Sequence, residues 1–266
     1  MPRAGTVTGP ALRGLSRFAD ARGVPAGREF LLDYDVIEAF CVAGLPGRAS
    51  STRGTYRSAL YRLAETANGL PGQRPTPFPG ASAPAPYSPA ERAELAALAA
   101  AQRDAAKRSS ALALVVFGIG AGLRPGELVA LRGSDVTRHS RRVSVHVSGS
   151  AARVVPVTPG YAGRAAGLAA AAGNAHLFRP GPASRGYKNF VTNFARTLAA
   201  DPAAPRLTLG RCRSSFICGH LAAGTPVGEL LAITGICQAE SLARYARHVD
   251  GAPAKAALRA WDKRRR

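Results

Sequence analysis

Apolar residues recur every three or four positions along most of the chain, which is the pattern of amphipathic helices. Residues 1–69 contain two such stripes. They are formed by Leu12, Leu15 and Phe18, and by Phe30, Leu31, Tyr34, Ile37 and Phe40. After a break at Pro46 and Gly47, the run Ser50-Ser51-Thr52 offers N-caps for a further helix through Ala67. We therefore expect residues 1–69 to form a helical domain.

The helical pattern stops at residues 70–87, where the sequence LPGQRPTPFPGASAPAPY is rich in proline and small residues. Such a composition favours an extended, semi-rigid linker. Directly after it, Ser88-Pro89-Ala90-Glu91 has the order of a capping box, with Ser88 as N-cap and Glu91 as N3. This signal predicts a helix to about Arg103 and places a second domain at residues 88–266.

Within residues 88–266 the helical spacing gives way once to alternation. The segments RVSVHV, from Arg142, and RVVPV, from Arg153, alternate apolar and polar residues around a loop that contains Gly149, which predicts a β-hairpin. Helices are expected over 110–119, 161–172, 188–200, 211–223, 226–233 and 240–249, with a short basic helix over 254–266. The predicted fold class is mostly α with a small antiparallel sheet.

The net charge of the chain indicates the kind of partner that it binds. The 266 residues carry 36 lysines and arginines against 16 acidic residues, a formal net charge of +20. Such an excess implies a polyanionic partner, and double-stranded DNA is our expectation. The sequence has no run of about 18 apolar residues and no apolar signal core at its N-terminus, so we expect a cytoplasmic, nucleoid-associated protein without a membrane span.

No cofactor or metal is expected from the motifs. The chain has no P-loop, no GxGxxG and no metal-binding spacing of cysteine and histidine. We interpret its four cysteines as small core residues. They are Cys41, Cys212, Cys218 and Cys237.

One stretch, GIGAGLRPGELVALRGSD from Gly118 to Asp135, has the pattern of a helix–turn–helix joint. Gly120 and Gly122 suit the end of one helix, and Pro125 suits the first turn of the next. Arg124 then lies beside a helix N-terminus, whose free N–H groups favour an anion. The alternative is a plain joint with a surface arginine.

The predicted helix over residues 50–67 has a basic face. Arg53, Arg57 and Arg62 alternate with tyrosine and leucine, which suits contact with a DNA backbone. A solvated helix face with buried tyrosines is the alternative.

Four segments together resemble the tyrosine recombinase (phage integrase) family. GLRPGELVALRGSDV is similar to the segment of the family's first arginine, which assigns that role to Arg124. RVVPV is similar to the stretch after the catalytic lysine, and RCRSSFICGHLAAG to the second-arginine helix, which assigns Arg213. LLAITGI followed by SLARYARHV is similar to the segment that ends in the nucleophile, which assigns Tyr245.

The resemblance covers the whole chain and implies a helical core-binding domain, a linker and an integrase-like catalytic domain. It implies a site-specific recombinase or integrase that cleaves and rejoins DNA through a 3′-phosphotyrosyl intermediate, without a metal or cofactor, and that assembles on DNA as a homo-tetramer. Tyr245 would be the nucleophile, and Arg124 and Arg213 would clamp the phosphate. Three positions depart from the family pattern: Gly210 replaces a histidine, Ile236 replaces a histidine or tryptophan, and Ser148 replaces the lysine.

The departures leave two functions open. Loss of a general acid costs about 10²–10⁴ in rate, which implies a slow enzyme. His146 is a candidate substitute for the lysine, or else a plain strand residue. The other function is that of an impaired recombinase that only binds DNA. TPVGELLAITGICQAESLARYARH also has the pattern of a helix-turn-helix motif, with Arg244 and Arg247 on its second helix.

Overall fold

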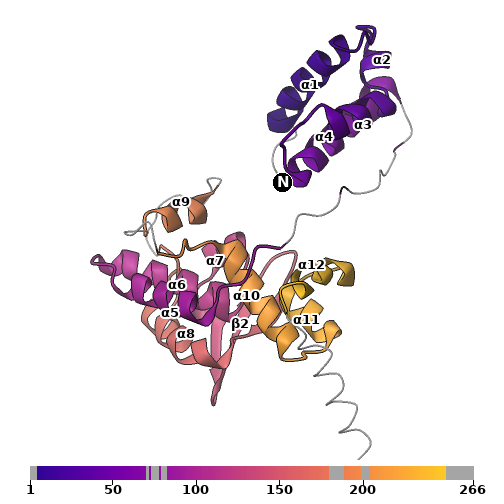
Figure 1. The fold of residues 1–266 in the computed structure, drawn as a ribbon. Coiled ribbons are helices and arrows are strands. Elements are labelled where there is room, and N and C mark those ends of the chain that lie inside the picture. The colour runs from indigo at the N-terminus through magenta and orange to yellow at the C-terminus, as the bar shows by residue number, and fades with distance from the viewer. Residues whose placement is uncertain are drawn as a thin grey trace, which may run out of the picture. The chain divides into compact units, whose positions relative to one another are not determined.

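The computed structural model describes residues 5–69, 72, 78, 83–179, 189–198 and 204–249. The chain divides into two compact units, residues 1–82 and residues 83–266 (Figure 1). The predicted basic helix over 254–266, and parts of the predicted helix over 188–200, lie outside the described residues. In the described part of the chain, no helix is both long enough and apolar enough to cross a membrane.

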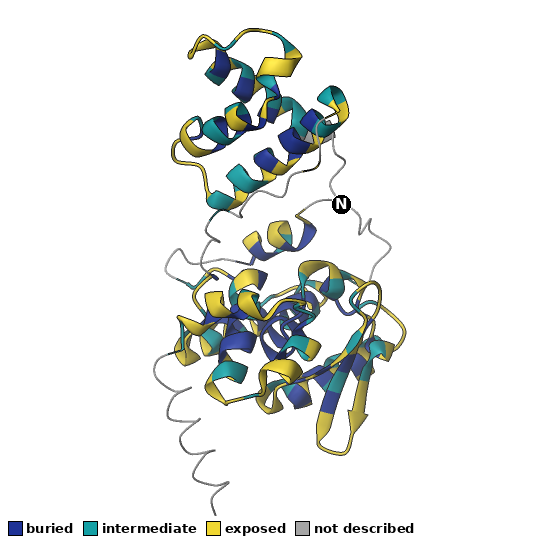
Figure 2. Ribbon diagram, turned by 90° about the vertical axis from the view of Figure 1, so that its right-hand side faces the viewer, coloured by how far each residue is buried: buried dark blue, intermediate teal, exposed yellow. Residues whose placement is uncertain are grey.

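The first unit is a bundle of helices. Its elements are α1 (Gly5–Asp20), α2 (Arg28–Leu31), α3 (Tyr34–Ala43) and α4 (Ser50–Asn68). Helices α1, α3 and α4 pack on one another, and their buried faces meet in one core (Figure 2). That core contains Leu15, Ile37, Phe40, Cys41 and Leu60.

Two details of the first unit differ from the prediction. The N-cap position of α4 is Ala49, which makes no side-chain cap, so the expected Ser50-Ser51-Thr52 caps are wrong. Phe30 was expected in the apolar stripe but is 49% exposed. It lies on α2, a single turn too short to bury a continuous face.

The second unit contains further helices and one sheet. The helices are α5 (Pro89–Ala100), α6 (Ala105–Gly120), α7 (Pro125–Ala130), α8 (Pro159–Ala172), α9 (Phe190–Arg196), α10 (Leu209–Ala222), α11 (Val227–Thr234) and α12 (Ala243–Ala246). Two 3₁₀ turns, Gly133–Asp135 and Ala239–Leu242, complete the described elements. Helix α6 is buried along its second half and packs against α5, α8 and α10 (Figure 2). The predicted capping box of α5 is confirmed, because Ser88 and Glu91 bond each other's backbone N–H groups.

The sheet has three antiparallel strands in the order β1-β2-β3. The predicted hairpin is formed by β2 (Arg142–Val147) and β3 (Arg153–Pro156). Strand β1 (Val136–His139) was not expected, since only one of its four residues is apolar and it shows no alternation. Val145 of β2 pairs with Val136 on one side and Val155 on the other.

The predicted helix over 240–249 is confirmed in part, because the chain is helical as far as Ala246 but does not form one α-helix. The chain there forms the 3₁₀ turn Ala239–Leu242 and then the single turn of α12. Leu242 and Tyr245 are three residues apart and both are buried. Because residues i and i+3 lie on the same face of a helical turn, both side chains reach the core.

The start of the second unit also differs from the prediction. Residues 83–87 were expected in the linker, but they belong to this unit. Tyr87 is buried, and its hydroxyl donates to the Arg206 carbonyl and accepts from the Thr208 N–H. These contacts fix the segment before α5 onto the segment that leads into α10.

Candidate active site

The joint between α6 and α7 depends on a glycine. Gly122 has φ +60°, and a Cβ placed there would lie 2.5 Å from the Phe216 ring of α10. A side chain at this position would therefore meet both backbone strain and a steric clash. The chain then enters α7 with Pro125 in its first turn, as predicted, and Arg124 as the N-cap residue. The joint thus fixes the backbone position from which the Arg124 side chain extends.

Backbone carbonyl groups hold the two arginines of the predicted site. Arg124 donates from Nη2 to the Gly235 carbonyl at 2.6 Å. Arg213, on α10, donates from Nη1 to the Gly122 carbonyl and from Nη2 to the Thr234 carbonyl, each at 2.6 Å. The two guanidinium groups therefore tie the end of α6 to the end of α11.

Tyr245 comes from α12 and lies in the same region. Its side chain is 8% exposed and belongs to the core of the second unit. Its carbonyl accepts from the Cys218 thiol of α10 at 3.6 Å, and the Arg244 guanidinium lies 5.4 Å from its ring centre. The Cys218 contact fixes α12 against α10.

The structure brings all three predicted residues together. Arg124, Arg213 and Tyr245 line one cavity of about 390 Å³. The rest of its lining comes from the turn after α11 and the segment that leads into α12. Those residues are Gly235, Ile236, Cys237, Gln238, Ser241 and Arg244.

The cavity concentrates positive charge. Burial lowers the pKa of Arg213 below its ordinary value, and the nearby charge of Arg124 lowers it further. The ionised forms of Tyr245 and Glu127 act in the opposite direction, so both lie within electrostatic reach of Arg213. Two like charges held together in a part-buried site cost free energy, and an anion between them would relieve that cost.

An ion pair that the sequence did not predict supports the site. Glu127 and Arg153 are joined by two hydrogen bonds, Nη1 to Oε1 at 2.7 Å and Nη2 to Oε2 at 2.9 Å. Glu127 also accepts from the Arg124 N–H at 2.8 Å, and Arg153 donates from Nε to the Ile233 carbonyl at 2.9 Å. Burial raises the pKa of Glu127, but these hydrogen bonds and charges outweigh it and leave the pKa below its ordinary value. The only sequence signal was the place of Glu127 at N3 of α7.

The three departures from the family pattern occupy different places. Ile236 lines the cavity, whereas Ser148 and Gly210 are exposed, at the end of β2 and at the start of α10. His146 is exposed on β2, with Nε2 3.2 Å from the Thr137 hydroxyl, and it is not among the residues that line the cavity.

The arginines predicted on α4 do not form one basic face. Arg57 is buried, forms an ion pair with Glu38 at 3.2 Å and lies 4.0 Å from the Phe78 ring centre. We therefore withdraw Arg57 as a DNA contact, because its side chain is committed to the core of the first unit. Arg53 is half-buried and bonds the carbonyl groups of residues 48 and 42, whereas Arg62 is exposed.

Within the described residues, no group of three histidine, cysteine, aspartate or glutamate side chains is arranged to hold a metal ion. Cys41, Cys212 and Cys218 are buried, as expected for core residues. Cys237 is exposed and lines the cavity, so its interpretation as a core residue is wrong.

No family model and no curated protein matches the sequence, but solved structures match the fold. The XerH site-specific recombinase bound to palindromic difH substrate, a post-cleavage complex, has a TM-score of 0.60 at 14% identity; the match covers 93% of this chain and 76% of that one. The Tn1549 transposon integrase in complex with transposon right end DNA has a TM-score of 0.58 at 15% identity, over 95% and 99% of the two chains. The same integrase with circular intermediate DNA has a TM-score of 0.57 at 17% identity, over 94% and 99%.

These similarities define the fold. The chain has the fold of the tyrosine recombinases and integrases, mostly helical with a small antiparallel sheet. The predicted fold class is confirmed.

Proposed function

We propose that this chain is a DNA strand transferase of the tyrosine recombinase type. The observation that carries the proposal is the single cavity lined by Arg124, Arg213 and Tyr245. The fold supports it, since the similar XerH and Tn1549 proteins are a site-specific recombinase and an integrase solved with DNA. The net charge of +20 supports a polyanionic substrate.

Arg124 and Arg213 are the proposed phosphate ligands. A guanidinium has five N–H donors in a planar fork that matches two phosphate oxygens. The carbonyl bonds use one donor of Arg124 and two of Arg213, so each side chain retains donors for the non-bridging oxygens. The two charges would stabilise the negative charge that grows on the phosphate in the transition state.

Tyr245 is the proposed nucleophile. Its Oη forms a bond to phosphorus while the bond from phosphorus to the 5′-oxygen breaks, and the strand is then held as a 3′-phosphotyrosyl ester. The phenolic proton is lost, and the leaving 5′-oxygen gains a proton. Rejoining reverses these steps, so the reaction needs no oxidant and no external energy source.

The residue at position 148 predicts that this reaction is slow. With Ser148 in place of the lysine, the leaving oxygen lacks that general acid, at a cost of about 10²–10⁴ in rate. The second candidate function, DNA binding without cleavage, is favoured by the residues at positions 148, 210 and 236. For its helix-turn-helix version, the second helical segment is the 3₁₀ turn Ala239–Leu242 followed directly by the single turn of α12.

The first unit is the proposed core-binding domain, and DNA-dependent assembly into a tetramer is proposed with it. Arg53 and Arg62 remain as proposed backbone contacts on α4. Arg62 is the stronger of the two, since it is exposed while Arg53 bonds backbone carbonyl groups.

The test is a covalent capture. The full-length protein is incubated with a library of nicked duplexes, and the adducts are isolated under denaturing conditions and sequenced to define the site. A suicide substrate that carries this site should then give a protein–DNA band on a denaturing gel. If the protein binds that site tightly but gives no band, the non-cleaving alternative replaces the proposal.

A further inference from the structure

A second cavity lies beside the later turns of α10, apart from the cavity of Tyr245. We name it the α10 pocket and define it by Arg92, Ile119, Tyr161, Phe216, Gly219 and His220. Its volume is about 300 Å³, at the low end of the range of small-molecule sites. It shares no lining residue with the cavity of Tyr245, and Gly219 is exposed at its edge.

Two glycines at the end of α6 admit the aromatic walls of the α10 pocket. A Cβ at Gly120 would lie 2.7 Å from the Cβ of Tyr161, and a Cβ at Gly122 would lie 2.5 Å from the Phe216 ring. The Phe216 ring also meets the His220 ring edge-on, with the ring centres 4.5 Å apart. Further apolar lining comes from Ile119, Pro156, Val157 and Pro159. The walls are therefore apolar and are formed largely by rings.

Arg92 gives the α10 pocket a charge that has no counter-ion. The side chain is half-buried, and its Nε donates to the Tyr87 carbonyl at 3.0 Å. Among the described residues this is its single hydrogen bond, and the neighbouring Glu91 is paired with Arg211 instead. No acidic residue lines the pocket. The guanidinium is thus anchored by one donor and retains the others for an anion.

Two neutral polar groups complete the lining. Burial lowers the pKa of His220 below its ordinary value, so its imidazole is neutral at pH 7, and Nδ1 lies 3.0 Å from the Thr225 hydroxyl. Burial raises the pKa of Tyr161, while the nearby charge of Arg92 acts in the opposite direction, so the phenol keeps its proton. Neither Nε2 of His220 nor the Tyr161 hydroxyl has a hydrogen-bond partner in the described chain. Arg92 therefore carries the one full charge of the lining.

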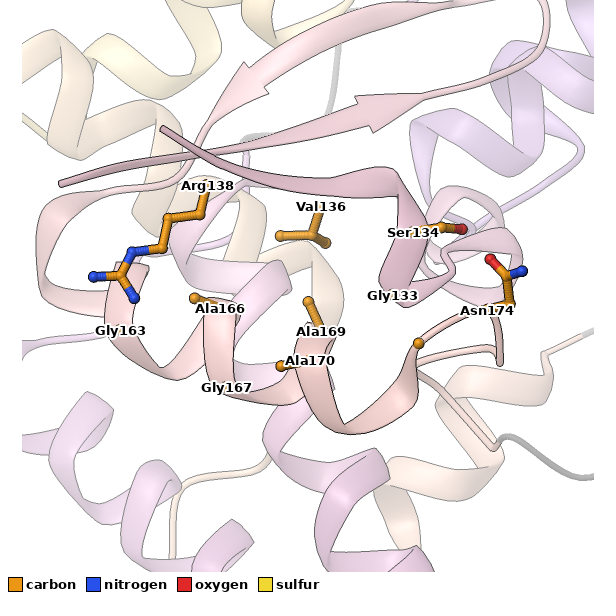
Figure 3. A pocket seen from close by; sticks show the side chains of 11 residues that line it. Gly133, Ser134, Val136, Arg138, Gly163, Ala166, Gly167, Ala169, Ala170 and Asn174 are labelled. Carbon is orange, nitrogen blue, oxygen red and sulfur yellow. The ribbon is translucent and has the colours of Figure 1, made fainter. Parts of the chain in front are cut away.

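The larger groove between α8 and strand β1 lacks these features (Figure 3). Its lining is mostly glycine and alanine, with Arg138 as the one charged side chain and no aromatic ring. Such a groove offers a ligand no ring to pack against.

The lining of the α10 pocket defines the chemistry of its ligand. Flat apolar walls favour a ring, which would pack against Tyr161 and Phe216. The fork of Arg92 matches the two oxygens of a carboxylate. The volume limits the ligand to one or two rings. We propose that the α10 pocket binds a small aromatic carboxylate.

The test uses the full-length protein without DNA and 2-naphthoate as the probe. A ligand-observed NMR titration should give saturable binding with a Kd of about 1 mM or tighter. Acetate at a tenfold higher concentration should not displace the probe, because it has no ring. Absence of saturable binding would overturn the proposal, and so would displacement by acetate, since the pocket would then be a simple anion site.

Paired variants locate the bound probe. Arg92→Gln should weaken binding about tenfold or more, whereas Arg103→Gln, an exposed arginine just after α5, should change it little. Equal losses in these two variants would mean that net charge alone attracts the probe.

The second pair fills space without removing a polar group. A Cβ at Gly219 or at Gly228 meets nothing within 4 Å, and only Gly219 lines the pocket. Gly219→Leu should therefore abolish binding, and Gly228→Leu should retain it. Retained binding in Gly219→Leu would place the probe elsewhere and overturn the proposal, whether or not Arg92→Gln folds.

One other occupant would be revealed by the same proteins. If 2-naphthoate does not bind but Gly219→Leu disrupts self-association in light scattering, the pocket takes a side chain of a second copy and the proposal is wrong. The binding test contains no DNA, so its result is independent of the proposed strand transfer.

Discussion

Arg153 and Glu127 form a buried ion pair beneath the cavity, with side-chain exposures of 7% and 11%. Glu127 also accepts from the N–H of Arg124, and Arg153 also bonds the carbonyl of Ile233, one residue before Thr234. This ion pair thus connects the backbone of Arg124 to the end of α11. At that end, the carbonyl groups of Gly235 and Thr234 accept hydrogen bonds from the guanidinium groups of Arg124 and Arg213.

Replacing Glu127 by glutamine should destabilise the protein by about 3–5 kcal/mol, because Arg153 would remain buried without its counter-charge. The double variant Glu127→Gln with Arg153→Met should recover part of this loss. Denaturant unfolding of the three proteins measures it, and a single variant as stable as the wild type would contradict this account of the pair.

The same carboxylate predicts a pH dependence. The pKa of Glu127 is lower in the folded protein than its ordinary value of 4.5, so its contribution to stability is complete above about pH 4.5. That contribution should be lost as the pH falls from there through the folded pKa. The difference in unfolding free energy between the wild type and Glu127→Gln should therefore shrink between pH 6 and pH 3. A constant difference would show that the charged form of Glu127 is not what stabilises the fold.

Tyr245→Phe should abolish the covalent adduct and leave DNA binding unchanged. The substitution removes one oxygen and keeps the ring that packs in the core. A denaturing gel and a binding titration on the same substrate give the two values. An adduct that survives would place the nucleophile on another residue.

Arg213→Lys should reduce adduct formation by about 10²–10³ and leave binding nearly intact. The ammonium keeps the charge, but it cannot reproduce the planar fork that bonds the carbonyl groups of Gly122 and Thr234 while it also faces a phosphate. Single-turnover cleavage at saturating protein separates the chemical step from affinity. Arg211→Lys, on the same helix but paired with Glu91, is the matched control.

Ser148→Lys should accelerate cleavage by about 10² or more. Ser148 is exposed directly after β2, so the longer side chain requires no repacking. Ala152→Lys, in the same loop and also exposed, is the control for added charge. Equal rates for the two variants would mean that position 148 has no special access to the leaving oxygen.

Much of the fold follows from local patterns, and the exceptions have physical causes. The α5 capping box and the β2–β3 hairpin depend on neighbouring residues, and both were predicted. The pairing of Arg57 with Glu38 joins positions 19 residues apart, so a helical face could not show which arginine is buried. Strand β1 exists because β2 offers it a partner, and its own sequence gives no signal.

The candidate site also has one part that the sequence predicted and one part that it did not. The resemblance to a family supplied Arg124, Arg213 and Tyr245, which the structure places in one cavity. The contacts that hold them, with the carbonyl groups of Gly122, Thr234 and Gly235, arise only when α10 and α11 pack against the α6–α7 joint. No spacing rule within the sequence encodes those contacts.

The glycine at position 122 has a consequence for how the proposed phosphate site is assembled. Its missing side chain lets Phe216 approach, and its carbonyl holds Arg213, three residues before Phe216 on the same helix. Core packing therefore sets the direction of a guanidinium before any phosphate arrives. The site is preorganised, so in the proposed reaction the free energy of orienting that charge would be contributed by folding and not by the cleavage step.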